Sequence, residues 1–160
     1  MEMSLADMDS KWMLFIKTGS TAMQLSLKTH SQTEMIDITG EVQRLIDASG
    51  VREGICMVYV PHTTAAVTIN ENADPSVPAD MLMVLNQMVP WKAPYRHREG
   101  NSPAHVKSAL IGSSELVQVE GGRLVLGTWQ GIFFCEFDGP RSRKVNITWM
   151  ASTFTSPSQS

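Results

Sequence analysis

Hydrophobic and polar residues alternate through the first part of the chain with the period of a β-strand. An apolar patch covers residues 12–16, and Met23, Leu25 and Leu27 then occupy every second position of the following segment. Successive side chains of a strand point to opposite faces of a sheet, so a period of two indicates a strand with one buried face. This pattern predicts two strands within the first 35 residues.

Three later segments favour helices. The first begins near Thr39, which is suited to cap a helix, and it ends at Gly50 after an apolar stripe with helical spacing. A second helix is expected over about 76–88, entered through prolines, and a shorter one over about 104–111. Between them, residues 90–103 show no apolar period, which is typical of a long functional loop.

The remaining apolar runs have the length and composition of buried strands. They cover residues 54–60, 65–69, 116–119, 123–127, 131–137 and 143–149. The turn sequences Gly121-Gly122 and Asp138-Gly139-Pro140 separate some of these runs, so hairpin pairing is expected there. The order of elements predicts a single compact α+β domain, a mainly antiparallel β-sheet or sandwich with two or three helices on one side.

The composition supports one domain. The chain has 160 residues, of which 42% are hydrophobic, and this suffices for one hydrophobic core. No repeat or low-complexity linker divides it, so the domain is expected to span 1–160, with a flexible polar tail at 154–160. Cys56 and Cys135 each lie in an apolar run, which indicates reduced core residues rather than a metal or disulfide framework.

The charge distribution limits the expected partners. Thirteen basic and sixteen acidic residues give a net charge of −3, which argues against nucleic acid or anionic lipid as a general partner. Residues 1–90 hold five basic and eleven acidic side chains, whereas residues 91–144 hold eight basic and five acidic ones. An anion site is therefore expected in the second half. No run approaches the roughly 18 apolar residues of a membrane span, and acids precede the first apolar patch, so a cytoplasmic protein is expected.

Three of the four histidines lie in loops or at the ends of elements, namely His62, His97 and His105. Imidazole is a common metal ligand and carries protons near neutral pH, so convergence of the three would make a metal or acid–base site. A solvated or turn-bonding histidine is the alternative for each. His30 is expected at the surface.

Two polar segments follow or interrupt buried strands. Residues 70–74 combine two carboxylates and two amides that would suit Mg²⁺ or a substrate, although capping by Asp74 would explain much of the segment without a ligand. Residues 127–131 place a hydroxyl, an indole and an amide between glycines, which is typical of a bulge beside a ligand. The alternative there is a bulged hairpin with Trp129 in the core.

Glu136 lies within an apolar strand, where a carboxylate is costly without a cation or metal beside it. Arg141 and Arg143 follow closely, and a guanidinium suits a phosphate and a carboxylate equally well. The two arginines are therefore expected either to hold a phosphate group or to form a salt-bridge cluster with Glu136 and Asp138.

Four motifs in sequence order give the chain a resemblance to a known family. They are NENADPSV, YRHREGNSPAHVKSALIGSS, GTWQGI and EFDGPRSRKV, within about residues 20–150. With these motifs the chain resembles the YjbQ-like family, whose members are described as secondary thiamine-phosphate synthases. The resemblance implies a compact α+β core over about 20–150 and assembly as a homotrimer.

Carried onto this sequence, the resemblance also implies a site. The resemblance implies a catalytic role for His62, His97, His105 and Glu136. It also implies that the three histidines bind a metal. The residues implied in substrate binding are Thr63, Asn70, Asn72, Lys107, Thr128, Gln130, Arg141 and Arg143. A divalent metal is expected as the cofactor, Zn²⁺ if histidines supply the ligands and Mg²⁺ if oxygen atoms do.

The activity that the resemblance implies joins a pyrimidine methyl diphosphate to a thiazole phosphate and releases pyrophosphate. Such a transferase needs cations near the leaving diphosphate, and the basic second half of the chain would supply them. Two alternatives stay open. One is a noncatalytic trimeric protein that binds a small phosphorylated or anionic metabolite, and the other is a metal-assisted hydrolase of such a metabolite.

Overall fold

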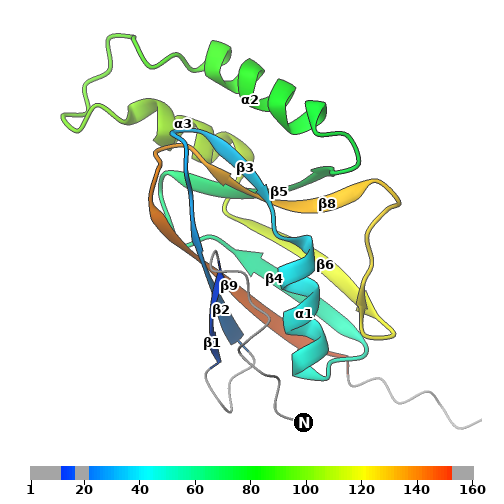
Figure 1. Ribbon diagram of the computed structural model, residues 1–160. Coiled ribbons are helices and arrows are strands. Elements are labelled where there is room, and N and C mark those ends of the chain that lie inside the picture. Colours follow the sequence, from blue (N-terminus) through cyan, green and yellow to red (C-terminus); the bar gives the residue numbers. More distant parts are fainter. Residues whose placement is uncertain (1–11, 17–21, 153–160) are drawn as a thin grey trace, which may run out of the picture.

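The computed structural model describes residues 12–16 and 22–152. Along the chain the elements are β1 (Trp12–Ile16), β2 (Ala22–Lys28), β3 (Glu34–Asp37), α1 (Thr39–Ser49), β4 (Gly54–Tyr59), β5 (Ala65–Glu71), α2 (Ser76–Met88), α3 (Ser102–Ile111), β6 (Ser114–Glu120), β7 (Arg123–Leu124), β8 (Gln130–Glu136) and β9 (Ser142–Ala151). Two sheets lie one above the other, and α2 and α3 cover the far face of the smaller sheet (Figure 1). The expected α+β class with antiparallel pairing is confirmed.

The main core fills the space between the two sheets. The larger sheet has the strand order β1-β2-β9-β4-β6-β7, and the smaller one has the order β3-β8-β5. Alternate residues of β2 and β9, among them Leu25, Leu27, Val145 and Ile147, point into this core. α1 closes it with Val42, Leu45 and Ile46, the apolar stripe expected for the first helix. The helices thus lie on two sides of the molecule, α1 beside the main core and the other two outside the smaller sheet (Figure 1).

Strand β8 is buried on both faces. Ile132 and Phe134 point into the main core, whereas Phe133 and Cys135 pack into a second core beneath α2 and α3. A strand covered on both faces gains from apolar side chains at every position, which accounts for the continuous apolar run in the sequence. Both cysteines are free and buried, as expected.

Several element boundaries differ from those expected. The short strand β3 was not predicted from the alternating N-terminal pattern, and the third helix begins at Ser102 rather than near Ala104. Thr39 does not cap the first helix, because Ile38 occupies the N-cap position. The Thr39 hydroxyl instead accepts the backbone N–H of Ile132 at 2.8 Å and so joins α1 to β8.

The outer helix α2 has no fully buried residue. Leu82 and Leu85 are partly buried against the second core, whereas Met88 at the end of the helix is 67% exposed. Within the described ranges, no helix is both long and apolar enough to cross a membrane. The expected flexible tail, residues 154–160, falls outside these ranges.

Candidate functional site

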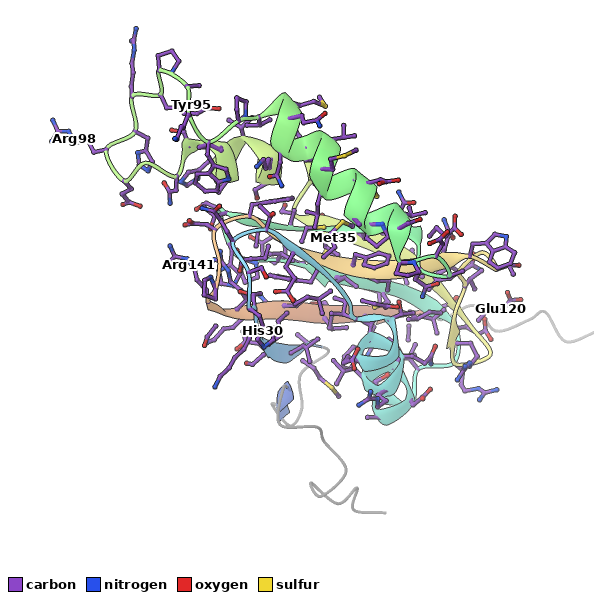
Figure 2. All side chains as sticks on the ribbon, turned by 45° about the horizontal axis from the view of Figure 1, so that its top comes forward. His30, Met35, Tyr95, Arg98, Glu120 and Arg141 are labelled. Carbon is purple, nitrogen blue, oxygen red and sulfur yellow. The ribbon has the colours of Figure 1, made fainter. Side chains whose placement is uncertain are left out.

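A cavity of about 350 Å³ opens where β8 ends and β9 begins. Its walls come from the loop after β4, the start of α3 and the turn between β8 and β9. The lining residues are Pro61, His62, Thr63, Thr64, Glu99, Asn101, His105, Asp138, Arg141 and Arg143. Arg141 lies at the same end of the molecule as the projecting loop that carries Arg98, and Glu120 lies at the opposite end (Figure 2).

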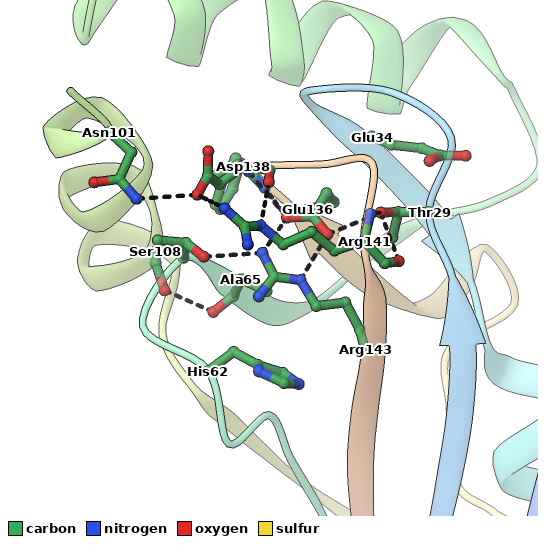
Figure 3. Close-up of polar contacts among 12 residues, drawn as sticks. Thr29, Glu34, His62, Ala65, Asn101, Ser108, Glu136, Asp138, Arg141 and Arg143 are labelled. Atoms are coloured by element: carbon green, nitrogen blue, oxygen red, sulfur yellow. Dashed lines mark hydrogen bonds and ion pairs between the residues drawn. The ribbon is translucent and has the colours of Figure 1, made fainter. Parts of the chain in front are cut away.

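A buried ion pair between Glu136 and Arg143 stands beside this cavity. Glu136 is fully buried and Arg143 is 6% exposed. Arg143 donates from Nε to Oε2 at 2.7 Å and from Nη2 to Oε1, which is a bidentate contact (Figure 3). Two charge-assisted hydrogen bonds offset part of the cost of removing both charges from water. The expectation that an arginine holds Glu136 is confirmed.

Three further groups of the chain donate hydrogen bonds to the Glu136 carboxylate. The Thr29 hydroxyl donates to Oε2 at 2.9 Å, and the backbone N–H groups of Phe137 and Asp138 donate to Oε1 at 3.1 and 2.9 Å. The adjoining turn approaches so closely that a Cβ at Gly139 would collide with the Glu136 side chain. Glu136 is therefore fixed in place and has little capacity to take up a further donor.

The pairing changes the role that Arg143 can have. Its Nε–Nη2 edge, which suits a phosphate, is occupied by Glu136, and Nη2 also donates to the Thr64 hydroxyl at 2.8 Å. Nη1 has no hydrogen-bond partner among residues 22–152. Arg143 can therefore offer a ligand one nitrogen rather than the expected bidentate fork.

Arg141 is also paired. Its Nε donates to the Asp138 carbonyl and its Nη2 donates to the Asp138 carboxylate, both at 2.7 Å. The Arg141 side chain is 52% exposed, so this ion pair lies at the surface and contributes little to stability. The salt-bridge cluster that was one of the two expectations for the arginines is present, and each guanidinium lining the cavity is matched by a carboxylate.

His62 is half-buried at the end of β4 and lines the cavity. Its Nε2 accepts the backbone N–H of Lys144 at 2.9 Å. Burial lowers the pKa of His62, and the neighbouring positive charge of Arg143 lowers it further. The ring is therefore neutral at neutral pH, with its single proton on Nδ1.

His97 and His105 lie together on the other wall. Their ring centroids are 5.3 Å apart in an edge-to-face arrangement, and His97 Nε2 is 3.9 Å from a Glu99 carboxylate oxygen. A second cavity of about 330 Å³ is lined by His97, Ser102, His105 and Val106. His105 therefore forms a wall common to both cavities.

The three histidines do not form a metal centre within one chain. In the part of the chain that the structure describes, no group of three or more His, Cys, Asp or Glu side chains is arranged to hold a metal ion. The reason at His62 is specific, because the Nε2 lone pair is already bonded to the Lys144 N–H. Among the described residues His97 and His105 lie close together, whereas the expected three-histidine site does not fit the geometry of one chain.

Four of the expected substrate-binding residues lie at the other end of β8. Strand register places Asn70 opposite Gly131 and Ala65 opposite Glu136. These positions are five residues apart along each strand, which corresponds to roughly 17 Å. The residues at the distant end are Asn70, Asn72, Thr128 and Gln130. The structure therefore divides the expected site into two clusters.

The distant cluster is held by contacts within the chain. Asn72 donates from Nδ2 to an Asp37 carboxylate oxygen at 3.0 Å. Asp74 accepts the backbone N–H of Ser76, the first residue of α2, at 2.8 Å, although Pro75 and not Asp74 occupies the N-cap position. Trp129 is 63% exposed, so the alternative that placed it in the core is wrong.

Lys107, another expected substrate-binding residue, does not line the cavity. Its side chain is fully buried, donates to Asn86 Oδ1 and lies 5.5 Å from the centre of the Trp91 ring. Burial lowers the pKa of Lys107. The ammonium group thus links α2, α3 and the loop after α2, and it is not positioned to contact a ligand in this cavity.

Five cavity residues were absent from the expected site, namely Pro61, Thr64, Glu99, Asn101 and Asp138. Thr64 supplies the hydroxyl that accepts from Arg143, and its position directly after Thr63 was the available signal. Asn101 is 8% exposed and donates from Nδ2 to Asp138 at 3.0 Å, while its Oδ1 is buried without a partner among the described residues. Asn101 occupies the N-cap position of α3 but makes no side-chain capping hydrogen bond.

Comparison with known proteins agrees with this architecture. The family described as UPF0047 protein YjbQ-like matches residues 23–152. The UPF0047 protein YugU of Bacillus subtilis is 54% identical over 127 residues, covering 79% of this chain and 96% of the relative. A UPF0047 protein of Methanocaldococcus jannaschii is 50% identical over 121 residues, covering 76% and 88%.

Solved structures show the same fold. The crystal structure of an uncharacterized conserved protein of the YjbQ/UPF0047 family from Clostridium acetobutylicum has a TM-score of 0.78 and 52% identity, covering 79% of this chain and 98% of the other. A YbjQ-like protein of unknown function from Sulfolobus solfataricus has a TM-score of 0.79 and 29% identity, covering 88% and 99%. This chain belongs to the YjbQ-like UPF0047 family.

Proposed function

We propose that the cavity at the Glu136–Arg143 end binds a small metabolite that carries an anionic, oxygen-rich group. The observation that carries this proposal is that three residues lining one cavity each keep a donor without a partner among the described residues, namely Nη1 of Arg141, Nη1 of Arg143 and the Nδ1 proton of His62. A volume of about 350 Å³ suits one small ligand. Phosphate and carboxylate oxygens accept hydrogen bonds from such donors.

The reaction we propose is the thiamine-phosphate synthase-like transfer. A ring nitrogen of thiazole phosphate forms a bond to the methylene carbon of the pyrimidine methyl diphosphate, and the bond from that carbon to the diphosphate oxygen breaks. Pyrophosphate leaves with the electron pair, and the donors around the cavity would stabilise its developing charge. The second cavity across His105 supports a reaction of two substrates, because each could occupy one side of that ring.

A noncatalytic metabolite-binding protein is the second candidate. It is favoured by the pairing of both arginines with carboxylates, which leaves the cavity with few uncompensated positive charges. Incubation of the purified protein with both substrates separates the two candidates. Formation of thiamine phosphate and pyrophosphate supports the transferase, and saturable binding without product supports the binding protein. Hydrolysis of a phosphorylated metabolite, dependent on an added metal, would support the hydrolase alternative.

We propose a bound metal ion only if groups other than those of a single chain complete its coordination. His97 and His105 would supply two imidazoles, and a tetrahedral Zn²⁺ site would need further groups from a partner copy or a substrate. Elemental analysis of the purified oligomer, with His97→Ala and His105→Ala as comparisons, tests this. Stoichiometric zinc that disappears in both variants supports the metal, and a metal-free active protein contradicts it.

We also propose that the chain assembles as a homotrimer. Two apolar patches lie on opposite faces of the molecule. One is on the outer face of the larger sheet and contains Ile55, Leu116 and Met150, and the other is on α2 and α3 and contains Val84 and Leu110. Two different patches that cover one another between neighbouring copies make a head-to-tail contact, and such a contact gives a closed trimer when the rotation between copies is one third of a turn.

A further inference from the structure

His62 occupies a break in the larger sheet. The pairing of β4 with β9 ends at Tyr59 opposite Asn146, and Pro61 then has no N–H to continue it. Lys144 lies beyond the last pair of this register, and its backbone N–H bonds a side chain instead of a carbonyl of β4. The imidazole of His62 takes the place of that carbonyl, because its Nε2 accepts this N–H at 2.9 Å.

This contact fixes the tautomer of the ring. An Nε2 atom that accepts a hydrogen bond carries a lone pair, so the proton of the neutral ring is on Nδ1. Protonation of Nε2 would turn two donors toward each other. Nδ1 has no partner among residues 22–152, while the same residue lines the cavity beside Arg143.

We propose that His62 binds the ligand as a fixed neutral hydrogen-bond donor, through Nδ1–H to a phosphate or carboxylate oxygen. This inference rests on the proposed function of the cavity and assigns His62 a role other than the expected one of base or metal ligand. A base needs a free lone pair, and both ring nitrogens lack one, since Nε2 is bonded to Lys144 and Nδ1 carries the proton. His62 is then a specificity residue that selects an acceptor oxygen.

Two substitutions test the roles of the two ring nitrogens of His62 separately. His62→Gln extends an amide oxygen toward the Lys144 N–H but removes the group at Nδ1. His62→Asn places an amide N–H₂ near the position of Nδ1 but is too short to reach Lys144. We expect His62→Gln to keep the melting temperature while weakening the binding of inorganic pyrophosphate by about ten- to a hundredfold. His62→Asn is expected to lower the melting temperature and to retain most of the binding.

The direct test is nitrogen-15 NMR of the imidazole in the full-length protein at neutral pH, first without and then with inorganic pyrophosphate. We expect the Nδ1–H tautomer in the free protein and a shift confined mainly to Nδ1 on titration. An Nε2–H tautomer or a charged ring would overturn the inference whatever the ligand. Pyrophosphate binding that leaves Nδ1 unchanged would overturn the donor role alone.

If the protein binds neither pyrophosphate nor thiazole phosphate, both the proposed function and the donor role are overturned. The tautomer of the free protein would still be measured in that case.

Discussion

At the scale of single residues, the charged side chains beside the cavity are paired with groups of the same chain. Glu136 accepts hydrogen bonds from Thr29, Arg143 and two backbone N–H groups. The need for a partner at Glu136 was predictable from the sequence, because a carboxylate in an apolar strand is costly alone. The consequence for Arg143 was not predictable, since sequence does not say whether a carboxylate or a phosphate occupies a guanidinium edge.

Glu136→Gln is expected to affect folding as well as function. The substitution leaves the Arg143 charge buried without its partner, and breaking a buried pair in this way costs about 3–5 kcal/mol of unfolding free energy. Urea unfolding of Glu136→Gln, Arg143→Gln and the double variant measures this. We expect the double variant to lose clearly less than the sum of the two single variants. Additive losses would show that the two residues act independently.

His62 is expected to make stability dependent on pH. Its pKa is lowered in the folded chain, whereas an unfolded histidine titrates near 6.5. As pH falls below that value the unfolded chain takes up the proton first, so the folded state loses stability until its own lowered pKa is reached. Melting temperatures between pH 7.5 and 5 should fall more steeply in the wild type than in His62→Gln. Parallel curves would contradict the lowered pKa.

At the scale of elements, strands were easier to predict than their register. The continuous apolar run of β8 follows from burial on both faces, and the stripe of α1 follows from its packing in the main core. β3 was missed because only one of its four residues is buried and four residues are too few to show a period. The separation of Gln130 from Glu136 follows from the length of β8, whereas that of Asn70 from Glu136 depends on the register of β5 against β8, which long-range pairing decides and local sequence does not.

The contact of α2, α3 and the following loop through Lys107 gives a prediction at this scale. Lys107 has no carboxylate partner among residues 22–152, and a buried ammonium of this kind is unfavourable, as the lowered pKa of Lys107 indicates. Lys107→Met keeps the aliphatic length without the charge, so we expect equal or greater stability at pH 7. Lys107→Ala removes the packing as well and should lose about 2–4 kcal/mol by analogy with large-to-small core changes. Thermal unfolding of both variants checks this, and a large loss in Lys107→Met would show that the charge itself stabilises the contact.

At the scale of the whole molecule, the two apolar faces argue for assembly. Leu116 is 63% exposed on the outer sheet and Val84 is 45% exposed on α2. If neighbouring copies cover one face with the other, Leu116→Glu and Val84→Glu should each convert the trimer to monomer. Sedimentation velocity at several concentrations measures this, with Glu120→Lys at the far end of β6 as a surface control. A wild-type monomer, or variants that stay trimeric, would contradict the proposed contact.

The central claim is that the cavity recognises an anionic oxygen group, and calorimetric titration of thiazole phosphate against its dephosphorylated alcohol tests it most directly. We expect the wild type to bind the phosphate at least tenfold more tightly than the alcohol, since each hydrogen bond to a charged group contributes about 1.5–3 kcal/mol. Arg141→Lys, whose surface ion pair contributes little to folding, should reduce that difference without changing the melting temperature. Equal affinity for the two ligands, or an Arg141→Lys variant that binds the phosphate as tightly as the wild type, would contradict the account.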